Sequence, residues 1–139
     1  MPQDTPSTED TVPSSRSCSL GAPLVLVDSI TQAGHAAPGS VVVSGSHAGA
    51  SVVSYALAAR PLLAVFNDAG VGLDGAGIAA LTVLQASGVA ACAVAHDSAR
   101  IGEARSTLHD GVIAHANDAA RALGARPGVR LARWLLSES

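Results

Sequence analysis

The sequence predicts one α/β domain of three layers, with a mostly parallel sheet of four or five strands in a Rossmann-like or flavodoxin-like arrangement. Its 139 residues suit a single domain. The apolar runs at 39–44, 62–66 and 89–95 are continuous rather than alternating, which is typical of strands in a sheet covered on both faces. Segments of helical length separate these runs, and this alternation indicates right-handed βαβ units.

Residues 1–20 precede the domain, which we place at 21–139. They are rich in proline, serine and threonine, begin acidic, and lack the basic start and apolar core of a secretory signal. We therefore expect a disordered tail. Cys18 in this tail and Cys92 in an apolar strand make no disulfide framework, which favours free thiols and a cytoplasmic chain.

The first apolar run, at 23–30, is expected to be an edge strand. Only about nine residues separate it from the strand at 39–44, fewer than the dozen or so that a parallel crossover normally needs. We therefore expect this first strand to run antiparallel to its neighbour.

The remaining segments complete the alternation of helix and strand. Residues 74–88 predict a helix with Asp74 as its N-cap and Gly88 as its stop. The other expected elements are helices at 50–59, 117–124 and 129–136 and a short fifth strand at 111–115. We expect a homo-oligomer, because so small a domain leaves much of its apolar sheet to be covered. The last helix either contributes to this oligomer or docks on its own domain. The alanine-rich helix at 50–59 also permits close packing between helices.

Composition excludes several classes of function. All 8 basic residues are arginine, so the chain has no Schiff-base lysine, no lysine-bound pyridoxal phosphate and no P-loop lysine. Aromatic residues make up only 2% of the chain and no basic stripe is present, so nucleic acid is not an expected partner. No apolar run approaches the roughly 18 residues of a membrane span, so a membrane is not an expected partner either.

Polar and titratable residues follow each expected strand. In open parallel sheets, ligands bind beyond the carboxyl ends of the strands. The residues at these exits are Ser44, Gly45, Ser46 and His47, then Asn67 and Asp68, then His96, Asp97, Ser98 and Arg100, and finally His115 and Asn117. We expect the exits of the strands at 39–44, 62–66 and 89–95 to surround one small-molecule site, with the stretch "SGSHAG" at 44–49 as its floor.

These residue types predict acid–base chemistry. The candidate catalytic residues are Asp68, His47, Ser46 and His96, and the candidate binding residues are Ser44, Gly45, Asn67, Gly70 and Arg100. Backbone N–H groups at 44–47 would stabilise negative charge, and the arginine would hold an anionic group. Simpler roles stay open, with the serines as helix caps, Asp68 in an Asx turn and Arg100 in a surface ion pair.

The same positions also suit three other kinds of site. Gly70, Gly72 and Gly75 spell G-x-G-x-x-G after a strand, which suits a nucleotide, although Asp68 beside it would repel a pyrophosphate. Ser46 could be a nucleophile with a base from another strand. Asp68 with His47 and His96 could hold a divalent metal, although no established ligand spacing supports this.

The favoured function is a small cytoplasmic enzyme, a hydrolase, lyase or isomerase, that acts on a small carboxylate- or amide-bearing metabolite without a covalent cofactor. The alternative is a ligand-binding or regulatory subunit that uses the same pocket without turnover, with a nucleotide bound through the glycine-rich segment as one form of it.

Overall fold

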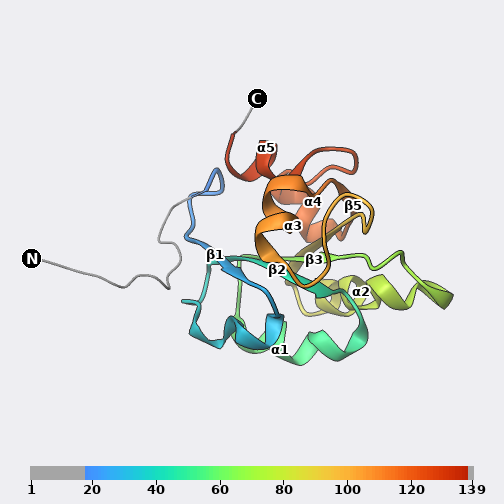
Figure 1. The fold of residues 1–139 in the computed structure, drawn as a ribbon. Coiled ribbons are helices and arrows are strands. Elements are labelled where there is room, and N and C mark those ends of the chain that lie inside the picture. The colour runs from blue at the N-terminus through green and yellow to red at the C-terminus, as the bar shows by residue number, and fades with distance from the viewer. Residues whose placement is uncertain (1–17, 138–139) are drawn as a thin grey trace, which may run out of the picture.

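A computed structural model describes residues 18–137, and it is a single α/β domain built on a five-stranded, mostly parallel sheet (Figure 1). The strands are β1 (Leu24–Val27), β2 (Val41–His47), β3 (Leu63–Asn67), β4 (Ala90–Val94) and β5 (Ile113–Ala116), and they lie in the order β1-β2-β3-β4-β5. The first four strands are parallel and β5 is antiparallel to β4. The α/β class and the parallel pairing of β2 with β3 are therefore confirmed.

The first strand differs from our expectation, because β1 is an edge strand that runs parallel to β2. The short crossover is possible because it contains a 3-10 helix, η2 (Ile30–His35), which rises further per residue than an α-helix. A capping box starts this helix: the Ser29 hydroxyl accepts a hydrogen bond from the N–H of Thr31, and the Gln32 side chain accepts one from the N–H of Ser29.

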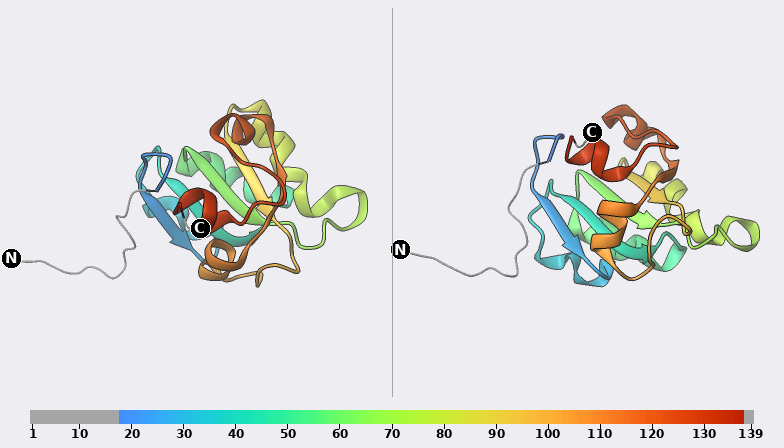
Figure 2. Two further views of the ribbon diagram at one scale, coloured as in Figure 1. Left: turned by 90° about the horizontal axis from the view of Figure 1, so that it is seen from above. Right: turned by 45° about the horizontal axis from the view of Figure 1, so that its top comes forward.

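Helices cover both faces of the sheet, as Figures 1 and 2 show. On one face, η2, η3 (Ala50–Val52), α1 (Val53–Ala59) and α2 (Ala79–Ala86) pack against Val42, Ala64, Phe66, Ala91 and Ala93. On the other face, α3 (Ala104–Asp110), α4 (Asp118–Leu123) and α5 (Leu131–Leu135) pack against Val41, Val43, Leu63, Val65 and Cys92. Alternate residues of each strand thus enter separate cores, which explains why the strand sequences are continuously apolar.

The path of the chain creates one crevice at the carboxyl edge of the sheet. The connections that leave β1, β2 and β3 all pass over the face that carries α1 and α2. The chain that leaves β4 instead turns to α3 on the opposite face. Loops that leave adjacent strands in opposite directions open a crevice between them, so the site favoured by this topology lies between β3 and β4. The sequential strand order itself differs from the Rossmann and flavodoxin orders, which reverse direction within the parallel strands.

Two local expectations change in the structure. The segment that leads into α2 begins as a 3-10 helix, η4 (Leu73–Ile78), with Gly72 at its N-cap, so Asp74 lies inside the first turn instead of capping it. Gly88 follows α2 in the left-handed conformation, as expected of a helix stop.

The first and the last described residues pack together on the domain. Leu131 and Leu135 of α5 are fully buried, so this helix docks on its own domain. Residues 1–17 of the expected tail lie outside the described residues. Cys18 is buried, and the N–H of Ser19 donates to the carbonyl of Leu135, so the domain begins before residue 21. None of the helices in the described part of the chain combines the length and apolarity that a membrane crossing requires.

Candidate functional site

A buried carboxylate, Asp68, lies at the crevice between β3 and β4. Its side chain is only 6% exposed. Oδ1 accepts hydrogen bonds from the backbone N–H groups of Gly70 at 2.8 Å and His96 at 2.9 Å. Two imidazoles flank the carboxylate, because His96 Nδ1 lies 3.5 Å from Oδ1 and His115 Nε2 lies 3.5 Å from Oδ2. The structure therefore brings two predicted catalytic residues, Asp68 and His96, together with a third side chain.

The alternation of side chains at the end of β3 explains how this arrangement forms. Asn67 and Asp68 are consecutive in an extended stretch, so their side chains leave the sheet toward opposite faces. The Asn67 amide group donates to the carbonyl of Ala99 at 3.2 Å, and its oxygen accepts from the N–H of Ala69 at 2.8 Å. Asn67 thus anchors the loop that follows β4, and Asp68 holds the start of the same loop through the N–H of His96.

His115 reaches the site by a route that the sequence did not indicate. We expected it at the exit of a fifth strand, but β5 is antiparallel and His115 lies within it, paired with Ala93. Because β5 runs the other way, Asn117 at its end lies at the opposite edge of the sheet. There its oxygen accepts from the N–H groups of Ala91 and Ala120 at 3.0 Å each, so Asn117 caps α4. The direction of β5 was the missing information, and no local pattern carries it.

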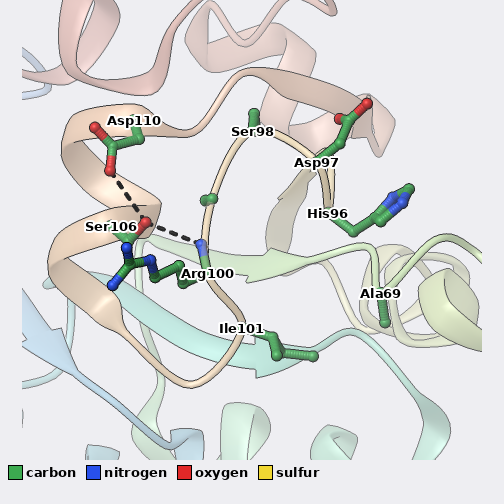
Figure 3. Close-up of a pocket in the computed structure, with 9 residues that line it drawn as sticks. Ala69, His96, Asp97, Ser98, Arg100, Ile101, Ser106 and Asp110 are labelled. Atoms are coloured by element: carbon green, nitrogen blue, oxygen red, sulfur yellow. Dashed lines mark hydrogen bonds between the residues drawn. The ribbon is translucent and has the colours of Figure 1, made fainter.

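An open cavity of about 740 Å³ lies beside this cluster (Figure 3). The loop after β4 and helix α3 supply nearly all of its lining, which consists of Ala69, His96, Asp97, Ser98, Ala99, Arg100, Ile101, Ser106 and Asp110. His96 is the member of the cluster that lines the cavity and is 59% exposed, whereas Asp68 is buried behind it. The predicted binding residue Arg100 also lines the cavity.

The hydroxyl groups of the cavity are already engaged. Ser98 donates to the carbonyl of Ala95 at 2.6 Å and accepts from the N–H of Val112 at 2.9 Å. Ser106 donates to Asp110 Oδ2 at 3.1 Å and accepts from the N–H of Arg100 at 2.9 Å, the pair of bonds drawn in Figure 3. Each proton thus points at an oxygen acceptor and not at an imidazole, so neither serine has the arrangement of an activated nucleophile.

The two thiols are equally unsuited to nucleophilic chemistry. Cys18 and Cys92 are both free and both buried. Burial raises the pKa of Cys92 from its ordinary value of 9.0 to about 12, because the low-dielectric core disfavours the thiolate.

Arg100 presents its guanidinium at the rim of the cavity. The side chain is 80% exposed, and Nη1 lies 3.9 Å from Oε2 of Glu103, three residues further along the chain. An exposed ion pair of this length contributes little to stability. It therefore does not prevent the guanidinium from binding an anionic group of a ligand.

The stretch Ser44–His47 does not lie where we expected it. The Ser44 hydroxyl is buried and donates to the carbonyl of Val65 at 2.8 Å. Ser46 Oγ accepts from the N–H of Ile30 at 2.9 Å, and His47 Nδ1 accepts from the N–H of Gly49 at 3.1 Å. None of these residues lines the cavity.

The loop after β4 is the reason, because it crosses this edge of the sheet and fills the space above β2. The N–H of Gly102 donates to the carbonyl of Gly45 at 2.7 Å. A β-carbon at position 45 would lie 2.3 Å from the backbone nitrogen of Glu103, so only glycine permits the contact. Gly45 therefore permits close contact with the backbone of this loop and does not line the cavity.

The backbone N–H groups of the three glycines in the segment after β3 donate hydrogen bonds to acceptors close by in the chain. Gly70, Gly72 and Gly75 have φ angles of 78°, 75° and 73°, in the left-handed region that favours glycine. The N–H of Gly70 donates to Asp68, that of Gly72 to the carbonyl of Gly70, and that of Gly75 to the carbonyl of Gly72. A dinucleotide fingerprint instead directs backbone N–H groups at the pyrophosphate. The geometry therefore suits a tight turn that positions Asp68.

The expected alternative of a metal site finds no support in the arrangement of ligands. Among residues 18–137, no group of three or more His, Cys, Asp or Glu side chains is placed to hold a metal ion. Comparisons of the chain with protein-family models, with curated proteins and with solved structures find no match. Function must accordingly be argued from the site itself.

Proposed function

We propose that the protein is a small enzyme that performs acid–base chemistry, as a hydrolase, lyase or isomerase, on a small metabolite bearing a carboxylate or an amide. The observation that carries the proposal is the buried Asp68 carboxylate, which lies 3.5 Å from each of two histidines in the crevice between β3 and β4. A buried carboxylate beside an imidazole holds the ring in one orientation and one tautomer, as proton transfer requires.

His96 is the proton-transfer group in this proposal. Its Nδ1 faces Asp68, which leaves Nε2 for a substrate or a water molecule. Its side chain is largely exposed and lines the cavity, whereas the Asp68 carboxylate is buried and engaged by two N–H groups. Asp68 therefore positions His96, and His115 lies against the second oxygen of the Asp68 carboxylate. His47, which we expected to move protons, plays no part because it lies outside the cavity lining.

Arg100 supplies the substrate preference. It is the only arginine in the lining of the cavity described above, and a guanidinium binds a carboxylate through two parallel hydrogen bonds. Because the serine hydroxyls of the cavity donate to other oxygens, the chemistry proceeds by proton removal from the substrate or from water. A covalent acyl intermediate on serine is disfavoured. Both thiols are free and buried, which supports action in a reducing compartment such as the cytoplasm.

The test is a panel of small carboxylates and amides incubated with the protein in D₂O and followed by NMR. Hydrogen exchange, elimination, isomerisation and hydrolysis are all visible in this assay. We expect one chemical class to react, and His96→Gln to lower the rate by about 10²- to 10⁴-fold while the ligand still binds. Arg100→Gln should instead weaken binding of the carboxylate ligand.

His109→Gln is the matched control, since His109 is an exposed histidine of α3 that does not line the cavity. Its rate should equal that of the parent protein. Ligands that bind at the cavity without turnover would favour the alternative of a binding subunit. Equal losses of rate in His96→Gln and His109→Gln would contradict the assignment of the site.

A further inference from the structure

We propose that the outer surface of α1 and α2 is the contact face of a homodimer, covered in solution by a second copy of the chain. Three apolar side chains of these helices, Tyr55, Leu57 and Val83, are between 37% and 47% exposed. They lie on two helices that contact each other on the same face of the sheet (Figure 1). Exposed apolar side chains gathered on adjacent helices are typical of interaction surfaces.

The helical segments that form this surface carry no charged side chain, and the exposed Arg60 directly follows α1. The exposed side chains described in η2, η3, α1 and α2 include none from Asp, Glu, Lys or Arg. Ordinary protein surfaces are about 25–35% charged, so an uncharged layer of these four helical segments is a clear departure. The helices on the opposite face have a normal surface, and their exposed charged residues include Arg105, Asp110, Asp118, Arg121 and Arg133. Depletion of charge is the feature that distinguishes the core of an interface from the rest of a surface.

The shape of α1 suits a close approach of two helices. Val52, Ala56 and Ala59 face the core, so the outward side of the helix is centred on Ser54 and Ala58. These two small residues are one turn apart and lie between the larger side chains of Tyr55 and Leu57. The distance between packed helices is set by the side chains at the contact. A helix with small side chains along the middle of its outward side and larger ones on either side can therefore pack closely against the same helix of a second copy.

The absence of charge argues for a second copy over an unrelated partner. A two-fold contact centred on these helices places the same patch on both sides, so two uncharged helical surfaces meet. A partner with an ordinary surface would have to bury charges for which this face offers no counter-charge, and unpaired buried charges are costly. The proposed dimer also leaves the cavity free, since the Asp68 and His96 cluster lies at the carboxyl edge of the sheet.

Sedimentation equilibrium from low to high micromolar concentration tests the proposal. The parent protein should be a dimer at high concentration, and Leu57→Glu should raise the dissociation constant of the dimer by at least about tenfold because two carboxylates would face an apolar contact. Val83→Glu should act in the same direction. Circular dichroism and thermal unfolding of each variant separate a loss of dimer from a loss of fold.

Ile101→Glu is the matched control, an apolar side chain of similar exposure on the loop after β4, away from α1 and α2. It should leave the dissociation constant unchanged. A parent protein that stays monomeric at every concentration would overturn the proposal. So would a dimer that Leu57→Glu and Val83→Glu leave intact, or that Ile101→Glu weakens equally.

Discussion

Replacing Asp68 with alanine removes the acceptor that holds two loops together. Its carboxylate accepts from the N–H groups of Gly70 and His96, one on each side of the crevice. A hydrogen bond to a charged group contributes at least about 1.5 kcal/mol, so the two bonds together should contribute about 3 kcal/mol to the free energy of unfolding. With an m value of about 1.5 kcal/mol/M, the midpoint of urea unfolding should fall by about 2 M.

The Asp68→Asn variant separates the structural contribution of this side chain from its charge. The amide oxygen of asparagine can still accept both backbone hydrogen bonds, but without the strength that a charged acceptor adds, so we expect a loss of about 1 kcal/mol. Amide hydrogen exchange gives a local check, because the N–H groups of Gly70 and His96 should exchange faster in Asp68→Ala than in Asp68→Asn. Equal unfolding midpoints for Asp68→Ala and the parent protein would refute the reasoning.

Two further predictions concern the core and the loop contact. Gly45→Ala should destabilise the protein by about 1–3 kcal/mol in urea unfolding, because the new methyl group meets the backbone of Glu103. Gly34→Ala, whose added methyl meets open space at an ordinary φ angle, should be neutral or up to about 1 kcal/mol stabilising, and an equal loss in both variants would contradict the clash. The Cys92 thiol keeps its proton in the folded state up to a pKa of about 12 but releases it above pH 9.0 when unfolded, so its contribution to stability is complete below pH 9.0 and is lost as the pH rises toward 12. From pH 9.0 upward, the parent protein should lose about 1.4 kcal/mol per pH unit relative to Cys92→Ala, and parallel pH profiles for the two proteins would contradict this.

Part of the candidate site follows from local sequence patterns. Asp68 and His96 each lie within two residues of the end of a continuously apolar run, and β3 and β4 are adjacent and parallel. Residues just past the ends of two such strands lie about 5 Å apart laterally, which places these side chains within reach of each other. Their proximity is therefore predictable once the two runs are recognised as neighbouring parallel strands.

Other parts of the site depend on contacts between distant segments. The stretch Ser44–His47 forms the carboxyl end of β2, with His47 paired to Asn67 just before Asp68. It is nevertheless covered by the loop after β4 through the contact between Gly45 and Gly102. His115 joins Asp68 because β5 turns back beside β4. Hydrophobic periodicity predicts neither the path of that loop nor the direction of that strand.

The sequence by itself determined the class of the fold, the buried strands and the pair of strand ends that carries Asp68 and His96. These features depend on the apolar pattern of single segments, which local steric and solvation effects translate into strands and helices. Only the tertiary structure decided which edge residues remain accessible, that β1 is parallel, and that a second histidine completes the surroundings of Asp68. Those outcomes are settled by which backbones can approach one another and by the face to which each connection turns, and both are properties of the whole packed domain.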